Sequence, residues 1–117
     1  MKPISASLHG YLDYATVVFF LLAPTLFGFD GLPAVISRTL AFVHLAVTLI
    51  SDFPLGAYRR LPFPVHGLIE RVVGPALVVL PFLFGFSDIE AARFFFILMG
   101  LGIVLVSWLT NYRAPVE

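Results

Sequence analysis

The stretch His9–Phe29, which reads HGYLDYATVVFFLLAPTLFGF, decides the fold. No charged residue occurs in it after Asp13. A helix needs roughly 20 apolar residues to cross a hydrocarbon core of about 30 Å. The stretch lacks the alternation that a barrel strand would show. It therefore predicts a membrane-spanning helix that carries a histidine and an acid at its head.

The same pattern recurs 57 positions later, where His66–Phe86 reads HGLIERVVGPALVVLPFLFGF. Seven of the 21 aligned positions are identical, namely the histidine, the glycine, the proline and the closing Leu-Phe-Gly-Phe. Asp13 corresponds to Glu70, so both repeats carry a carboxylic acid at this position. Chance similarity between two apolar segments would not be expected to match the histidine, glycine and proline as well. We infer an internal duplication, with residues 1–58 and 59–117 as two-span repeats of one membrane domain.

The composition is that of a membrane protein. Hydrophobic residues make up 60% of the chain and charged residues only 12%, against about 25% charged in soluble domains. The formal net charge of zero argues against a nucleic-acid partner. The absence of cysteine excludes disulfides, thiolate metal sites and cysteine nucleophiles. No catalytic motif is present, and we expect neither an enzyme nor a site for a soluble substrate.

Four apolar stretches predict four helices, over residues 8–29, 33–50, 65–86 and 91–110. Turn residues join them within each half, and Ser51–Pro64 is the longer central connection. Two spans in each repeat return the chain to the same side, so the halves are parallel about an axis along the membrane normal. The expected fold is an all-α polytopic four-helix bundle made of two transmembrane hairpins.

Positive charge predicts the orientation. The N-terminus, the central connection and the C-terminus carry more cations than the two short loops, and cytoplasmic segments are rich in Lys and Arg. We therefore expect a multi-pass protein of the bacterial inner membrane with both termini in the cytoplasm. The cations on the cytoplasmic side are Lys2, Arg59, Arg60, Arg71 and Arg113, and those near the outer ends are Arg38 and Arg93.

The repeated elements resemble the SPW-repeat family of small bacterial membrane proteins. The likeness lies in two hairpins, each with a head histidine, an acid four residues on and a proline before Phe-Gly-Phe. It extends to the central segment SDFPLG…RRLPFPVHGLIE and covers nearly the whole chain. The Ser-Pro-Trp tripeptide appears here as Ala23-Pro24-Thr25 and Leu80-Pro81-Phe82, so only the proline is kept. The resemblance implies four spans and supplies no activity.

Three interpretations are open for the repeated polar pairs, His9 with Asp13 and His66 with Glu70. In a structural role, each acid lies near its helix N-terminus, where the dipole favours negative charge. It then pairs with its own histidine or with Arg59, Arg60 or Arg71. In a relay, two acids and two histidines around an axis pass protons or ions. In a redox carrier, His9 and His66 are axial ligands of a haem or bind another metal.

Helical steps of 100° place the repeated residues on one stripe of each helix. We expect the stripes of the first and third helices, including Phe27 and Phe84, to meet near the pseudo-two-fold axis. Pro24 and Pro81 remove a backbone donor and are expected to kink their helices. His44, in the second helix, has no counterpart in the fourth and is expected to bond a neighbouring helix.

Near the outer ends, Arg38 and Arg93 are expected to snorkel or to pair with Asp30, Asp88 or Glu90. An anion or lipid-headgroup site is the alternative for these two arginines.

The leading functional interpretation is a structural or interaction role, as an accessory subunit of a larger bacterial membrane complex. The lipid bilayer and larger membrane-protein subunits are the expected partners, and no cofactor is expected. The first alternative is a proton- or ion-coupled transporter that uses Asp13 and Glu70. The second is the bis-histidine haem carrier.

Overall fold

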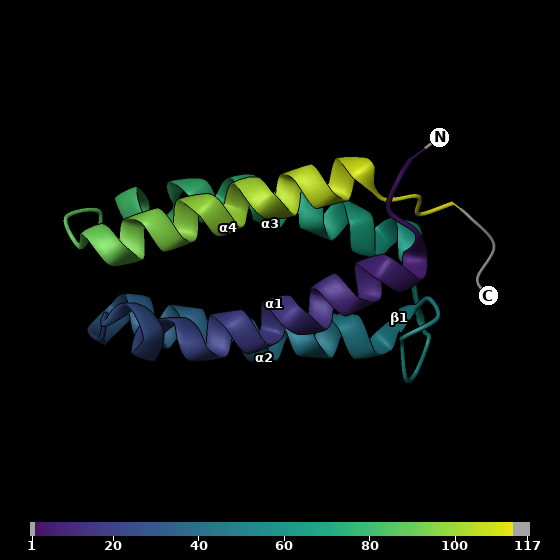
Figure 1. Cartoon of the computed structure of the whole chain (residues 1–117), viewed down its shortest axis with the longest axis horizontal. Helices are drawn as coiled ribbons and strands as arrows, with labels where there is room; N and C mark the ends of the chain where they lie inside the picture. Colours follow the sequence, from purple (N-terminus) through teal and green to yellow (C-terminus); the bar gives the residue numbers. More distant parts are fainter. Residues whose placement is uncertain (1, 114–117) are drawn as a thin grey trace.

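A computed structural model describes residues 2–113 of the chain. It contains four helices, all long and apolar enough to cross a membrane (Figure 1). The predicted all-α four-helix bundle is thereby confirmed, with each predicted boundary within three residues of the observed one. The helices are α1 (Ala6–Phe27), α2 (Gly31–Ile50), α3 (Phe63–Leu83) and α4 (Glu90–Leu109).

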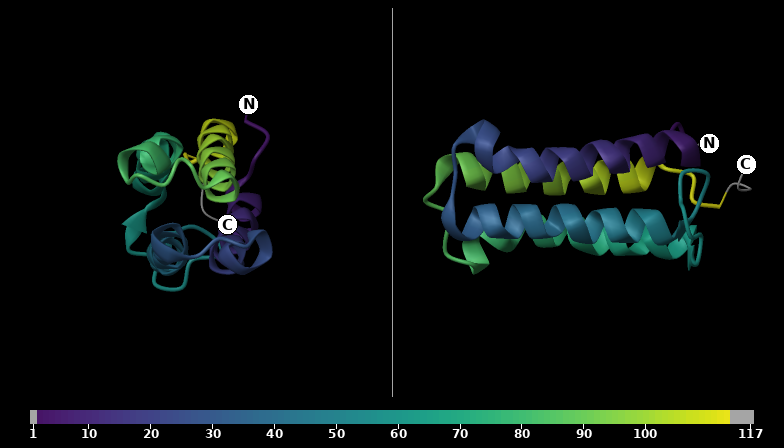
Figure 2. Two further views of the ribbon diagram at one scale, coloured as in Figure 1. Left: turned by 90° about the vertical axis from the view of Figure 1, so that its left-hand side faces the viewer. Right: turned by 90° about the horizontal axis from the view of Figure 1, so that it is seen from below.

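The helices pack as two hairpins, α1 with α2 and α3 with α4, in a bundle measuring 44 × 25 × 20 Å. Viewed from the end, the four helices form a square in which α1 and α3 lie on a diagonal (Figure 2). The N-terminal segment, the α2–α3 connection and the segment after α4 share one end of the bundle, here called the terminal end (Figure 1). The two short turns share the other, here called the loop end.

The repeated Pro…Phe-Gly-Phe element ends α1 and α3 in the same way. Gly28 and Gly85 adopt left-handed backbone, with φ of 71° and 77°, a conformation that glycine adopts without a Cβ clash. The next N–H in each case closes the turn, from Phe29 to the carbonyl of Pro24 and from Phe86 to that of Pro81. Both prolines lie inside their helices near the C-terminal end. The predicted kinks stay a prediction.

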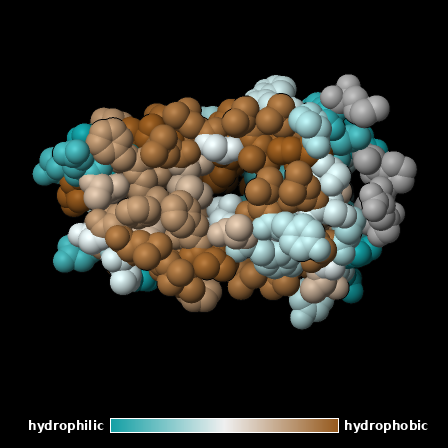
Figure 3. Space-filling view, in the orientation of Figure 1, coloured by the Kyte–Doolittle hydropathy of each residue, from teal (hydrophilic) through white to brown (hydrophobic). Residues whose placement is uncertain are grey.

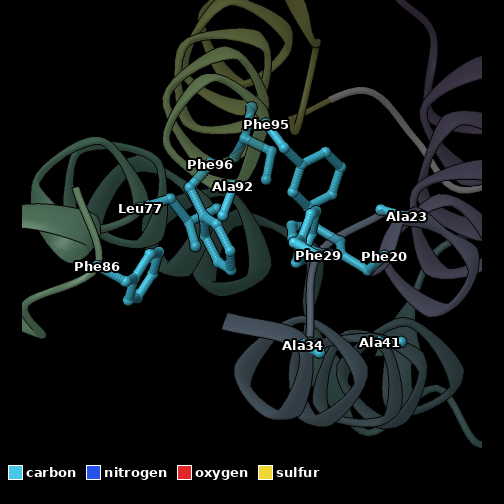
Figure 4. Packing of buried hydrophobic residues seen from close by; sticks show 11 residues of the cluster. Phe20, Ala23, Phe29, Ala34, Ala41, Leu77, Phe86, Ala92, Phe95 and Phe96 are labelled. Atoms are coloured by element: carbon cyan, nitrogen blue, oxygen red, sulfur yellow. The ribbon is translucent and has the colours of Figure 1, made fainter. Parts of the chain in front are cut away.

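Apolar packing fills the half of the bundle nearer the loop end (Figure 4). Aromatic rings from both hairpins meet there, and alanines at buried positions let the helix backbones approach closely. On the face shown in Figure 3, hydrophobic residues cover most of the middle and hydrophilic residues lie at the two ends. The buried cluster includes Phe20, Ala23, Phe29, Ala34, Ala41, Phe86, Ala92, Phe95 and Phe96.

One prediction about the inward stripes is wrong. Phe27 and Phe84 are 47% and 55% exposed, although they lie on the same predicted stripe as the head histidines. The stripes of α1 and α3 meet only at the terminal end. In the square bundle α1 and α3 stand at opposite corners, so they cannot pack against each other along their whole length. This explains why Phe27 and Phe84 are exposed.

Extended backbone at the terminal end links the head of each hairpin to the tail of the other. Strand β2 (Leu61–Pro62) pairs in parallel with β1 (Ser51–Asp52), and Leu61 lies opposite Ser51. Ile4 forms a parallel bridge with Thr110. Ile4 precedes His9 by five positions, as Leu61 precedes His66. The two heads are therefore anchored alike.

Candidate functional site

Both repeated polar pairs converge at the terminal end in one buried cluster. His9 and Asp13 project from α1, and His66 and Glu70 from α3. The side chains are 0–5% exposed, and one ligand-type atom from each lies within 4.8 Å of the other three. The sequence predicted the pair within each helix, and the structure brings the two pairs together. We call these four residues the His–carboxylate centre.

Each imidazole faces both carboxylates through its Nε2 atom. His9 Nε2 is 2.7 Å from Glu70 Oε1 and 3.2 Å from Asp13 Oδ1. His66 Nε2 is 3.1 Å from Asp13 Oδ2 and also contacts Glu70 Oε1. The centre therefore contains the predicted i,i+4 pairs and adds two pairs that cross between the hairpins.

The other nitrogen of each histidine is held by a hydroxyl from the opposite hairpin. His9 Nδ1 is 2.8 Å from Thr110 Oγ1, and His66 Nδ1 is 2.6 Å from Ser51 Oγ. Both hydroxyls donate their single proton to a backbone carbonyl, Thr110 to Val106 and Ser51 to Val47. Each hydroxyl must then accept from the imidazole. Nδ1 carries the proton in both rings, and Nε2 is the atom offered to the centre.

Aromatic rings enclose the centre and account for the glycine after each histidine. The rings of Phe63 and Tyr112 lie 5.5 and 5.4 Å from the ring of His9. A Cβ on Gly10 would come within 2.6 Å of the Phe53 ring, and one on Gly67 within 2.8 Å of the Tyr112 ring. A side chain at either position would displace the aromatic wall. The repeated His-Gly dipeptide therefore makes room for it.

His44 brings a third imidazole to the edge of the centre. Its Nε2 lies 3.3 Å from Asp13 Oδ1, although the pair lacks hydrogen-bond geometry. The contact joins α2 to α1, as expected for a histidine facing a neighbouring helix. The ring is 15% exposed, unlike the two rings inside the centre.

Of the two predicted partners for each acid, the histidine four residues earlier is found, and an arginine is not found among residues 2–113. Arg71 lies over the Trp108 ring at 4.1 Å, and Arg59 donates to the carbonyl of Pro54. The ionic contacts of Asp13 and Glu70 in this part of the chain are with histidines. The acids are buried in the bundle, whereas Arg59 and Arg60 are exposed and Arg71 is half-buried against Trp108.

The outer arginines also lack the predicted acidic partners within the described residues. Arg38 Nη2 donates to Thr25 Oγ1 at 3.2 Å, and Arg93 Nη1 donates to the carbonyl of Ser87 at 2.8 Å. Both lie in the first half of their helices, near the loop end. They bond local polar groups there, and the structure brings neither into the centre.

A cavity of about 170 Å³ opens beside the centre. Asp13, Glu70 and His44 line it together with apolar residues of α1 and α4. An opening between the two hairpins is visible on the face formed by these helices (Figure 3). The centre is thus buried in the bundle and still adjoins open space.

The centre can hold a small cation, whereas a haem does not fit. The rings of His9 and His66 are 5.3 Å apart at 79°, and the carboxylates of Asp13 and Glu70 occupy the space between their Nε2 atoms. A macrocycle between the two histidines would displace both acids. The arrangement of two imidazoles and two carboxylates matches the ligands that divalent metals use.

Sequence reasoning missed the hydroxyl partners. Two tripeptides occupy equivalent places, Ser51-Asp52-Phe53 and Thr110-Asn111-Tyr112. In each, the hydroxyl of the first residue contacts a histidine, and the ring of the third packs against the glycine after a histidine. The two tripeptides are 59 residues apart in the sequence, whereas the two histidines are 57 residues apart. An alignment that allowed a shift of two residues would have found them.

No protein-family model, curated protein or solved structure matches the chain significantly.

Proposed function

We propose that this chain is a small four-span protein of the bacterial inner membrane with a structural or interaction role, as an accessory subunit of a larger membrane complex. One observation carries the proposal. In the described residues, the histidines and carboxylates that are buried all belong to the centre at the terminal end. The rest of the interior is apolar packing with a few hydroxyl groups that donate to backbone carbonyls, such as that of Ser37. Such a bundle is a membrane unit whose buried acids and histidines gather at one end.

The distribution of hydroxyl groups argues against a transport path. A relay from the centre to the loop end would need polar groups along the interior. Thr16 lies one turn beyond Asp13, and its hydroxyl donates to the carbonyl of Leu12. Deeper in the bundle, the Ser37 hydroxyl donates to the carbonyl of Phe20. Both donors are committed to backbone, and the rings of Phe20 and Phe95 lie 5.4 Å apart.

Charge and exposed surface support the membrane placement. Lys2 and Arg113 border the same surface pocket at the terminal end, and Arg59 and Arg60 lie in the α2–α3 connection at that end. By the positive-inside rule this end faces the cytoplasm. Large apolar side chains are exposed along every helix, among them Leu26, Phe42, Leu83 and Leu98. In a bilayer these side chains meet lipid or neighbouring subunits.

The matched geometry of the two halves supports the internal duplication, which we retain as a proposal. The proposed kinship with the SPW-repeat family rests on the sequence motifs alone. The two histidines bond equivalent hydroxyls, the two glycines face equivalent rings, and the two Phe-Gly-Phe turns close on equivalent prolines. Independent origin would have to reproduce all three arrangements.

Gentle purification from the native membrane tests the accessory role. The full-length chain is extracted in mild detergent, and the same sample is examined by quantitative mass spectrometry and visible absorption. We expect larger membrane subunits in fixed ratio to the chain and no pigment. A protein that arrives alone would contradict the proposal. Proton uptake by vesicles that is lost in both Asp13→Asn and Glu70→Gln would replace it with transport.

A further inference from the structure

We infer that His9, Asp13, His66 and Glu70 bind a single divalent transition-metal ion of the Zn²⁺, Fe²⁺ and Mn²⁺ class, and that the ion joins the two hairpins. Each hairpin supplies one imidazole and one carboxylate, so an ion at the centre has two ligands from each. The inference concerns a ligand of the centre and stands independently of the accessory role.

The donor atoms are arranged at spacings close to those of a metal site. Bonds of about 2.0–2.2 Å to a tetrahedral Zn²⁺ separate neighbouring ligand atoms by roughly 3.4 Å. Asp13 lies 3.2 Å from His9 Nε2 and 3.1 Å from His66 Nε2. All four donors fall within 4.8 Å of one another. Glu70 Oε1 lies closer than this, at 2.7 Å from His9 Nε2, so the Glu70 carboxylate has to move away from the histidines to seat an ion.

The histidines are oriented as metal ligands are. In metal sites the non-ligating ring N–H is typically bonded to a fixed acceptor, which sets both the tautomer and the direction of the ring. Thr110 and Ser51 supply such acceptors here. If both rings are neutral, their Nε2 lone pairs point at carboxylate oxygens, and either protons shared within the centre or a cation between the groups relieves the repulsion. A divalent ion supplies the missing charge and leaves the centre neutral.

Two atoms of the centre lack hydrogen-bond partners. His66 Nε2 and Asp13 Oδ2 are buried and lie 3.1 Å apart, but the contact lacks hydrogen-bond geometry and neither atom has another hydrogen-bond partner. Burying a polar group without a partner costs on the order of 1–3 kcal/mol, so such groups normally bind something. A shared metal ion satisfies both atoms at once.

The ligand set selects the class of metal. Imidazole favours zinc, iron, copper and nickel, whereas carboxylate also accepts manganese. Calcium and magnesium prefer oxygen ligands throughout. Two nitrogens and two oxygens therefore favour borderline divalent ions over Mg²⁺ and Ca²⁺. The chain contains no cysteine, and a thiolate site for softer metals is excluded.

The neighbouring cavity provides room for exchange. Its volume of about 170 Å³ exceeds the roughly 30 Å³ that one water occupies in the liquid. Water in the cavity can complete the coordination of the ion and carry it to the centre. His44 borders the cavity and approaches Asp13.

Metal titration of the full-length, tag-free protein in detergent tests the inference. The chain is stripped with a chelator, titrated with Zn²⁺ in the presence of excess Mg²⁺, and analysed by calorimetry and elemental analysis. Co²⁺ serves as a visible stand-in that reports the coordination geometry. We expect one ion per chain, unaffected by Mg²⁺, with the absorption of a tetrahedral or five-coordinate Co²⁺ site.

Variants distinguish the centre from adventitious binding. Loss of an orienting partner of a metal ligand weakens binding by roughly 10- to 100-fold, and this range applies to Thr110→Val. His66→Gln removes a ligand, and we expect it to weaken metal binding by more than about 100-fold. Glu90→Gln is the matched control, because Glu90 is an exposed acid at the loop end. Equal affinity of His66→Gln and the wild type would overturn the inference.

Thermal unfolding covers the case in which a ligand variant fails to fold. A ligand that binds only the folded state raises its stability. Zn²⁺ should therefore raise the Tm of the stripped wild type by several degrees, and a chelator should reverse the rise. A wild type whose Tm ignores Zn²⁺ and that retains no ion would overturn the inference. Either result leaves the co-purification test of the accessory role unaffected.

Discussion

The two ends of the bundle hold the hairpins together by different physical means. At the terminal end, histidines and carboxylates of α1 and α3 meet across the bundle at hydrogen-bond distances. At the loop end, Phe95 of α4 packs against four phenylalanines of the first hairpin, at centroid distances of 5.4–6.0 Å. Polar contacts need defined directions, whereas ring packing tolerates small shifts.

The difference matters in a bilayer because lipid tails are as apolar as the side chains. Burying a phenylalanine between helices therefore gains little from the hydrophobic effect, and packing and hydrogen bonds supply most of the association. An unpaired buried carboxylate, in contrast, is costly in lipid. We infer that the terminal end fixes how the hairpins dock, while the loop end fills the remaining space.

The largest expected effect is that of Glu70→Gln at the terminal end. Both histidines of the centre face Glu70 Oε1, so the amide removes the charge that they share. Losing one partner of a buried ionic set costs about 3–5 kcal/mol. The free energy of unfolding in mixed detergent micelles measures the loss. Glu90→Gln should stay within about 0.5 kcal/mol of the wild type, and an equal loss in both variants would refute the contrast.

Next in size is Phe95→Ala, which tests the loop end. Phe95 is 5% exposed and Phe94 is 50% exposed. Buried Phe→Ala changes cost about 3–5 kcal/mol in water-soluble cores, and we expect about 3 kcal/mol here, because lipid can refill part of the space. Phe94→Ala is the adjacent control and should change the free energy of unfolding by less than about 1 kcal/mol. Similar losses from both changes would show that the ring cluster contributes little.

Gly67→Ala tests how tightly the aromatic wall closes on the centre. The new Cβ would lie 2.8 Å from the Tyr112 ring, and overpacking of this kind costs about 1–3 kcal/mol. Gly102 has open space at its Cβ position, so Gly102→Ala should be neutral or stabilise α4 through better helix propensity. The unfolding midpoint of Gly67→Ala in detergent should therefore fall, whereas that of Gly102→Ala should stay unchanged or rise. A stable Gly67→Ala protein would mean that Tyr112 moves freely.

Thr110→Val probes one hydrogen bond of the centre at nearly constant volume. It leaves the Nδ1–H of His9 without its acceptor, at a cost of about 1–2 kcal/mol for a buried donor. Thr25→Val at the loop end removes only the exposed bond from Arg38 and should cost less than about 0.5 kcal/mol. Unfolding measurements on the pair, made without added metal, separate the two ends. Indistinguishable variants would indicate that His9 finds another acceptor.

The smallest effect at neutral pH is expected from Tyr112→Phe. The Tyr112 hydroxyl is buried without a hydrogen-bond partner, so its removal breaks no hydrogen bond and should not lower the stability at neutral pH. Burial, and then the Glu70 carboxylate, raise the pKa of Tyr112 above its ordinary value. The folded chain thus binds this proton more tightly than the unfolded chain, and stability falls as pH rises above about 10. The variant should lose less stability over that range, and parallel pH profiles would contradict this.

Much of the fold could be predicted from the sequence, because length and apolarity determine spans. The pairing of each histidine with the acid four residues later also followed, since helical spacing alone brings them together. The cross-pairs, His9 with Glu70 and His66 with Asp13, depend on how two hairpins dock, and local spacing carries no information on docking. The shared centre could therefore be proposed only as one of three interpretations.

The errors have identifiable physical causes. Phe27 was placed inward by extending a 100° step over eighteen residues from His9, and the diagonal position of α1 and α3 leaves that turn exposed. Charge alone left histidine and arginine as alternative partners of each acid, and burial favoured the histidines, which are less costly to bury. Thr110 was overlooked because the tails of the hairpins follow a different offset from the heads.

The exchange of heads and tails has a consequence for how such a protein could arise. Ile4 and His9 of the first hairpin are completed by Thr110 of the second, and Leu61 and His66 of the second by Ser51 of the first. A chain of half the length, paired with an identical copy, would present every group found in the centre. Fusing two such genes would let one acid become aspartate and the other glutamate, and let a single unmatched histidine, His44, appear on one side only.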